Sequence, residues 1–97
     1  MDIRFIQNIA QQVFLHSPVR RAYLFGSAAR GEALPGSDLD ILVELDTTRL
    51  VGLVEYIKIQ MQLEEALHTK VDLVSADGIS PYIAPFIHQD KKLIYEA

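Results

Sequence analysis

The sequence predicts a small fold of the α/β (α+β) class, in which a mixed β-sheet of three or four strands packs against helices. Apolar residues recur at helical spacing near the N-terminus and again between residues 48 and 67. Short strand-like runs lie on both sides of the second segment, and Gly and Pro residues separate the periodic stretches. A chain of 97 residues has room for one hydrophobic core, so we expect a single domain over residues 1–97.

Composition excludes several classes of protein. A formal net charge of −4 argues against a direct nucleic-acid binder, because affinity for phosphate backbones comes from clustered Lys and Arg. The absence of Cys excludes disulfides, thiolate chemistry and zinc ribbons. Polar residues interrupt the apolar N-terminal stretch, so it is neither a signal peptide nor a membrane span. We therefore expect a cytoplasmic protein without a membrane partner.

The first elements follow from periodicity. A helix is predicted over residues 3–15 and ends at Ser17-Pro18. Residues 20–25 contain the run Ala-Tyr-Leu-Phe, which is apolar without alternation, as expected for a strand covered on both faces. This strand stops at Gly26-Ser27, and residues 28–30 predict one helical turn before a loop that is rich in Gly and Pro.

The next strand, residues 38–45, alternates in polarity. Because successive side chains of a strand take opposite faces, its two faces can be assigned. One face carries Leu39, Ile41, Val43 and Leu45, and the other carries Asp38, Asp40, Leu42 and Glu44. The first face is predicted to be core, and the second begins with two carboxylates.

A long helix is predicted over residues 48–67, with Asp46 or Thr47 as its cap. The apolar stripe expected to face the core consists of Leu50, Leu53, Val54, Ile57 and Met61. A second set, Tyr56, Ile59 and Leu63, widens it. This second set is either a docking surface for a partner or a further sheet-facing stripe.

The remaining segments complete the sheet. Residues 70–74 predict a third strand with Val71 and Leu73 on one face and Asp72 on the other. Residues 81–87 are helix-like with Pro near the start, and an apolar run follows close to the end of the chain. A helix of about 20 residues between the second and third strands favours a parallel, right-handed crossover. The 12-residue connection between the first two strands allows an antiparallel return.

Three carboxylates are expected on one face of this sheet. Asp38 and Asp40 share a strand face, and Asp72 lies on a neighbouring strand, within roughly 5 to 8 Å of one of them if the strands pair. Carboxylates that close repel one another unless a cation lies between them, and Mg²⁺ suits such oxygen ligands together with substrate phosphates. The alternative for a single Asp-x-Asp is a solvated strand end.

Gly26, Ser27 and Arg30 are the candidate phosphate contacts. Gly at the end of a strand allows a ligand to approach the backbone, and the N–H groups of a helical turn can bind an anion. Arg30 supplies a guanidinium that matches phosphate oxygens. The alternatives are an ordinary turn capped by Ser27, and an ion pair between Arg30 and Glu32 or another acid.

The string GSAARGEALPGSDLD, residues 26–40, resembles the signature of the DNA polymerase β-like nucleotidyltransferase superfamily. In that signature Gly-Ser is followed after ten residues by Asp-x-Asp, with a third Asp on a later strand; here ten residues separate Ser27 from the first Asp, and Asp72 matches the third. The inner Ala-Arg-Gly also resembles the small members called minimal nucleotidyltransferases. The resemblance covers roughly residues 2–95.

The resemblance implies a mechanism and a set of roles. Two Mg²⁺ ions would hold ATP, bound by Asp38 and Asp40. Asp72 would complete the metal site that activates the incoming hydroxyl and would take its proton, so the three Asp are the expected catalytic and metal-binding residues. Gly26 and Ser27 would contact the β- and γ-phosphates of the nucleotide.

The resemblance also implies a partner, because a chain of this length lacks the extra helical domain with which larger relatives hold the acceptor. Minimal members of this kind are paired with a helical HEPN-type ribonuclease toxin. They act as its antitoxin by transferring AMP from ATP to a toxin tyrosine. Two alternatives stay open: neutralisation of the toxin by binding alone, and a free-standing enzyme that nucleotidylates a small molecule.

Overall fold

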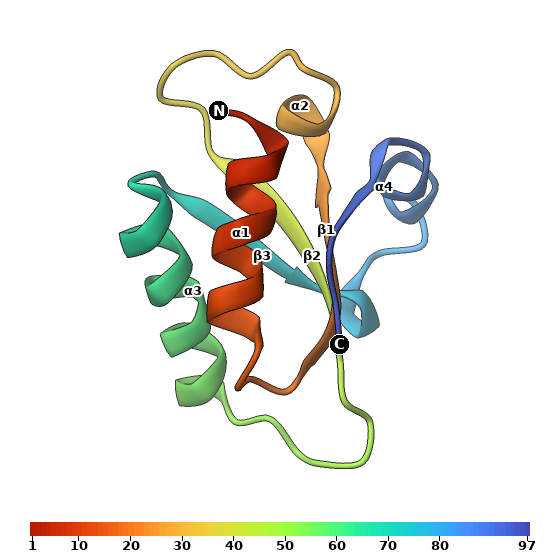
Figure 1. Ribbon diagram of the computed structural model, residues 1–97. Coiled ribbons are helices and arrows are strands. Elements are labelled where there is room, and N and C mark those ends of the chain that lie inside the picture. Colours follow the sequence, from red (N-terminus) through yellow and green to blue (C-terminus); the bar gives the residue numbers. More distant parts are fainter.

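The computed structural model describes residues 1–97. Its elements, in chain order, are α1 (Ile3–Phe14), β1 (Val19–Phe25), α2 (Gly26–Ala29), β2 (Leu39–Leu45), α3 (Leu53–Leu67), β3 (Val71–Ser75), the 3₁₀ turn η1 (Ala76–Gly78), α4 (Ala84–Asp90) and β4 (Lys92–Glu96) (Figure 1). The strands form one four-stranded sheet in the order β3-β2-β1-β4. The predicted α+β class with a mixed sheet is confirmed.

Strand directions agree with the connection lengths. β1 pairs antiparallel with both β2 and β4, whereas β2 pairs parallel with β3. The parallel pair is joined through α3, as the long helical connection predicts. In the β2–β3 register Asp40 is the Cα partner of Asp72, so the two predicted carboxylates lie side by side.

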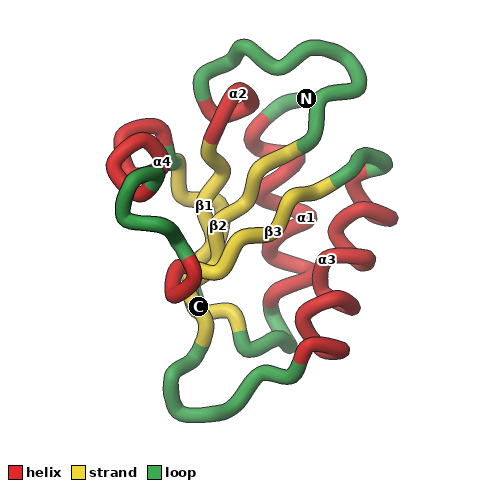
Figure 2. Tube along the Cα trace, turned by 180° about the vertical axis from the view of Figure 1, so that it is seen from behind, coloured by secondary structure: helices red, strands yellow, loops and turns green.

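One face of the sheet is covered by α1 and α3, which lie behind the strands in Figure 2. Alternate strand residues enter this layer: Leu39, Ile41 and Val43 of β2 are buried, as predicted. Between α1 and β4 the rings of Phe14 and Tyr95 pack with centroids 5.4 Å apart. The main hydrophobic core therefore lies between the sheet and these two helices.

The opposite face is covered only in part, by η1 and α4. Leu42 and Ile87 are buried there, outside the main core cluster. On β1, Tyr23 and Phe25 are half-buried on this face, and the Nζ of Lys91 lies 4.5 Å from the centre of the Tyr23 ring. The prediction that β1 is covered on both faces holds, although the second cover is incomplete.

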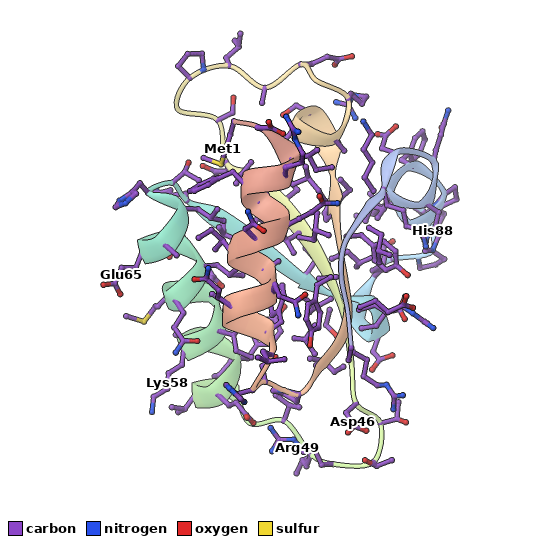
Figure 3. All side chains as sticks on the ribbon, in the orientation of Figure 1. Met1, Asp46, Arg49, Lys58, Glu65 and His88 are labelled. Carbon is purple, nitrogen blue, oxygen red and sulfur yellow. The ribbon has the colours of Figure 1, made fainter.

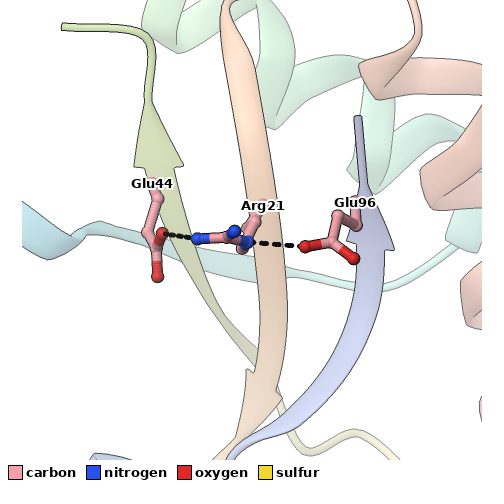
Figure 4. Close-up of polar contacts among 3 residues, drawn as sticks. All are labelled: Arg21, Glu44 and Glu96. Atoms are coloured by element: carbon pink, nitrogen blue, oxygen red, sulfur yellow. Dashed lines mark hydrogen bonds and ion pairs between the residues drawn. The ribbon is translucent and has the colours of Figure 1, made fainter.

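An ion-pair bridge crosses three strands near the end of the sheet that lies away from α2. Arg21 on β1 donates from Nε to Glu96 on β4 at 2.7 Å and from Nη1 to Glu44 on β2 at 3.4 Å (Figure 4). These contacts raise the pKa of Arg21, chiefly through the hydrogen bond to Glu96. The bridge therefore joins the three neighbouring strands through charged side chains.

The predicted start of the long helix is wrong. α3 begins at Leu53 after Gly52, five residues later than residue 48. Asp46 does cap a turn, but a different one: its Oδ1 accepts from the backbone N–H of Thr48 at 2.8 Å and from the Thr48 hydroxyl at 2.6 Å. Because this local turn satisfies Asp46, the chain continues as a loop to Gly52.

The predicted orientation of that helix is also wrong. The stripe expected in the core is exposed, with relative accessibilities of 95% for Leu50, 73% for Leu53, 68% for Val54, 44% for Ile57 and 60% for Met61. The buried residues of α3 are Ile59, Leu63 and Leu67, and Tyr56 packs against the core. The docking-surface interpretation of Tyr56, Ile59 and Leu63 is therefore wrong, and their sheet-facing alternative is confirmed.

Hydrogen bonds between α3 and the edge of the sheet give the reason. Tyr56 donates its hydroxyl to the carbonyl of Leu73 at 2.6 Å, and the Glu64 carboxylate accepts from the N–H of Val71 at 3.0 Å. β3 is an edge strand, so these backbone groups have no strand partner on that side. Satisfying them turns the Tyr56–Glu64 side of α3 inward. Lys58 and Glu65 then project away from the sheet (Figure 3).

The C-terminal segment forms a helix and a strand. The predicted helix over residues 81–87 is observed as α4, which starts at Ala84, has Pro85 in its first turn and ends at Asp90. β4 follows and adds the fourth strand beside β1. None of the helices has the length and apolarity that crossing a bilayer requires.

Candidate active site

The carboxylates lie on the sheet face that α1 and α3 leave open. Asp40 is half-buried on β2, Asp72 is exposed beside it on β3, and Asp38 is exposed just before β2 begins. Strand alternation places Asp40 and Asp72 opposite the core residues Ile41 and Leu73. The expected neighbourhood of Asp40 and Asp72 is thus present.

Electrostatics set Asp40 apart from an ordinary surface Asp. Burial raises its pKa most, and the negative charges of Asp72 and then Asp38 raise it further, while the nearby Arg30 opposes the rise. The negative charges of the three carboxylates therefore repel one another across the site. A cation bound between them would relieve the repulsion and favour the ionised form of Asp40.

The carboxylates do not form a preassembled metal cage. No group of three His, Cys, Asp or Glu side chains is close enough to hold a metal ion together. Mg²⁺ is usually bound by one or two carboxylates and completes its octahedral shell with water and substrate phosphate oxygens. Asp40 and Asp72, at paired positions of adjacent strands, fit that mode, in which phosphate supplies the missing ligands.

Gly26 brings the backbone against Asp40. Its φ of +72° is in the left-handed region, and a Cβ built on it would overlap the Oδ2 atom of Asp40. Both observations require glycine, the first because L side chains are strained at this φ and the second because there is no space. The end of β1 is thereby held in contact with the carboxylates.

The short helix α2 follows directly from Gly26. The Arg30 N–H donates to the carbonyl of Gly26 at 3.2 Å, and the Glu32 N–H donates to the carbonyl of Ser27 at 2.8 Å. The first N–H groups of a helix have no partner within the helix. Ser27, half-buried in this first turn, therefore lies where an anion next to the carboxylates would meet unpaired donors.

Arg30 is already engaged in ion pairs. Its Nη1 donates to Asp90 of α4 at 2.6 Å and its Nε donates to Glu32 at 3.1 Å. The hydrogen bond to Asp90, and then that to Glu32, raise the pKa of Arg30. The ion-pair alternative is confirmed, and it links α2 to α4. A phosphate contact by Arg30 stays a prediction.

Two residues that sequence reasoning did not assign to the site hold Asp72 in place. Tyr56 and Glu64 of α3 bond the backbone of Leu73 and Val71, the residues on either side of Asp72. Burial, followed by the charge of Asp72, raises the pKa of Tyr56, so its hydroxyl stays protonated as a donor. No sequence signal identifies them, because the bonds depend on how α3 lies along β3.

Comparison with known proteins agrees with this arrangement. A family model described as "Polymerase beta, Nucleotidyltransferase" matches residues 6–97. A Methanocaldococcus jannaschii protein named as a protein adenylyltransferase is 42% identical over 78 residues, 79% of this chain and 76% of the relative. The protein adenylyltransferase MntA of Thermococcus cleftensis is 39% identical over 66 residues, 68% of this chain and 65% of the relative.

Solved structures share the fold. A minimal nucleotidyltransferase is matched at a TM-score of 0.75 and 30% identity, over 95% of both chains. A toxin–antitoxin complex with AMP-PNP gives a TM-score of 0.75 at 22% identity, covering 100% of this chain and 75% of the other. A tri-AMPylated Shewanella oneidensis HEPN toxin in complex with MNT antitoxin gives 0.72 at 19% identity, over 99% and 74%. The last two structures are only 22% and 19% identical to this chain, so their similarity shows a shared fold and no more.

Proposed function

The chain belongs to the polymerase β nucleotidyltransferase family, and on that premise we propose that it is an Mg²⁺-dependent protein adenylyltransferase that acts as an antitoxin. Its substrate is ATP, and its acceptor is a tyrosine hydroxyl of a HEPN-type ribonuclease toxin. The observation that carries the proposal is the pairing of Asp40 with Asp72 on adjacent strands, with Gly26 packed against Asp40. The named functions of the relatives support the choice of a protein acceptor.

In the proposed reaction the tyrosine oxygen attacks the α-phosphorus of ATP. The new phosphorus–oxygen bond forms as the bond to the bridging oxygen of the β-phosphate breaks, and diphosphate leaves with that electron pair. Mg²⁺ supplies charge stabilisation for the attacking and leaving oxygens when it is bound. The products are AMP-tyrosine, diphosphate and the released hydroxyl proton.

Each site residue has a proposed role in this reaction. Asp38 and Asp40 hold the metal ions with the triphosphate. Asp72 completes the ligand set at the attacking hydroxyl and accepts its proton. Gly26 and Ser27 present backbone N–H groups to the β- and γ-phosphates of the leaving group. Arg30 contacts phosphate only after leaving one of its two acidic partners.

The test is to incubate the protein with Mg-ATP and a HEPN-type partner and to weigh the partner by mass spectrometry. We expect mass gains of whole AMP units on tyrosine with the wild type and with Asp77→Ala, a control that removes an exposed carboxylate from η1, beyond the C-terminal end of β3. The double variant Asp38→Ala plus Asp40→Ala should give none. An unmodified partner with the wild type, or modification by the double variant, would contradict the proposal.

A non-catalytic antitoxin is the second candidate, and the exposed stripe of α3 favours it. Leu53, Val54 and Ile57 leave an apolar helix face open to solvent, of the kind that protein partners cover. This candidate predicts that the Asp38/Asp40 double variant still protects cells from the toxin. A free-standing enzyme acting on a small molecule would instead consume ATP without any partner.

A further inference from the structure

An exposed apolar surface lies at the start of α4, on the side of the molecule that carries the candidate site. Tyr82, Ile83 and Phe86 are exposed to 86%, 54% and 66%. These three residues have no role in the proposed reaction. We call the surface formed by Tyr82, Ile83 and Phe86 the α4 rim.

Helical geometry fixes which way the α4 rim faces. Residues 83, 86, 87 and 90 share one side of α4, because steps of three and four residues return to the same face. Ile87 is buried against the sheet, and Asp90 reaches Arg30 on α2 at 2.6 Å. His88 lies on the side of α4 that points away from the sheet (Figure 3). Phe86 is thus one turn from Asp90, on the side of α4 that meets α2.

The α4 rim is continuous with the candidate site. Gly26, the first residue of α2, packs against Asp40, and Arg30 at the other end of α2 pairs with Asp90 of α4 at 2.6 Å. Figure 2 shows α4 beside β1, next to the sheet face that α1 and α3 leave open. Contacts therefore run from Asp40 through Gly26 and α2 to Arg30 and Asp90, and Phe86 lies one turn before Asp90 on α4. The rim therefore lies on the helix that pairs with the end of α2, where the proposed function places the phosphates.

We propose that the α4 rim is the base-binding subsite, with the ring of Phe86 stacking on the purine of the nucleotide and Tyr82 and Ile83 extending the platform. This inference rests on the proposed function, since it assumes a nucleoside triphosphate at the carboxylates. Aromatic stacking tolerates different bases because every base presents a π-face. The rim offers apolar carbon, and the carboxylate of Asp90, one turn after Phe86 on α4, is paired with Arg30. Recognition is therefore by stacking area, and purine nucleotides bind more tightly than pyrimidine nucleotides, with little distinction between ATP and GTP.

Isothermal titration calorimetry with Mg-ATP and with Mg-triphosphate, which lacks the base, tests the subsite. We expect Phe86→Ala to weaken ATP binding roughly 5- to 30-fold, the loss of one aromatic stacking contact, and to leave triphosphate binding unchanged. Phe86→Trp should retain or improve ATP affinity. Phe5→Ala is the matched control, because Phe5 is also exposed, at 45%, but lies on α1 behind the sheet.

The outcomes separate the two proposals. Equal ATP affinity of Phe86→Ala and wild type overturns the base subsite and leaves the enzyme proposal standing. An equal loss of affinity for ATP and for triphosphate in Phe86→Ala also overturns the base subsite, because it points to a disturbed α2. Weaker modification of the partner by Phe86→Ala at unchanged ATP affinity also overturns it and assigns the rim to the acceptor protein. A wild type that binds neither ligand overturns the nucleotidyltransferase proposal itself.

Discussion

Gly26 lies where β1 turns into α2, and two separate causes require a glycine there. The positive φ disfavours any L side chain, and the carboxylate of Asp40 occupies the place of a Cβ. We expect Gly26→Ala to lower the free energy of unfolding by about 2–4 kcal/mol, from left-handed strain plus overpacking. Urea denaturation of the variant and the wild type measures the difference.

Gly31 is the matched control for this prediction. Its φ is +74°, but nothing lies within 4 Å of the position of a Cβ. Gly31→Ala should therefore cost only the backbone strain, about 1–2 kcal/mol. If both variants lose the same stability, the close approach of Gly26 to Asp40 has no energetic weight. Adding Asp40→Ala to Gly26→Ala should recover part of the loss.

The pKa of Asp40 gives a second prediction. Burial, Asp72 and Asp38 raise it above the usual value of 3.8. Ionised Asp40 thus opposes folding above the folded-state pKa, and this cost disappears below the unfolded-state value. An NMR titration of the Asp40 carboxyl in metal-free protein should show a midpoint above 3.8, which Asp72→Asn lowers by removing a like charge. Saturating Mg²⁺ should lower it too. A midpoint at or below 3.8 without metal would contradict this account.

At the scale of elements, α3 shows that a periodic pattern does not by itself say which side of a helix is buried. The helix has apolar residues on more than one side, so its sequence contains two stripes. The stripe with Ile59, Leu63 and Leu67 is buried, while the stripe with Leu53 and Ile57 is exposed. Hydrogen bonds to the β3 edge select between them: Tyr56 bonds Leu73, 17 positions away in the sequence, and Glu64 bonds Val71, 7 positions away.

Two isoleucines of α3 test this orientation. Ile59 is exposed to only 4%, whereas Ile57 is exposed to 44%. Ile59→Ala should lower the free energy of unfolding by about 2–5 kcal/mol, and Ile57→Ala by about 1 kcal/mol or less. Both replacements change helix propensity equally, so the difference in urea midpoints reports burial. Equal losses, or a larger loss at Ile57, would mean that the helix faces the other way.

At the scale of the whole molecule, the two faces of the sheet differ: one packs against the main core and the other carries the carboxylates. One face holds α1, α3 and the main core, and the other carries the carboxylates of Asp40 on β2 and Asp72 on β3. Changes among Asp38, Asp40 and Asp72 therefore leave the main core untouched. The Arg30–Asp90 ion pair links the end of α2 to α4.

The sequence by itself determined the class of fold, the direction of strand pairing and the identity of the carboxylates. Strand alternation, connection length and the Gly-Ser to Asp-x-Asp spacing are local quantities, and the observed β2–β3 register agrees with them. Only the tertiary structure decided which side of α3 is buried, where that helix starts, that Tyr56 and Glu64 brace Asp72, and that Arg30 pairs with Asp90. These features depend on contacts between distant segments, whose energies outweigh local preference once the sheet edge and the helices are packed together.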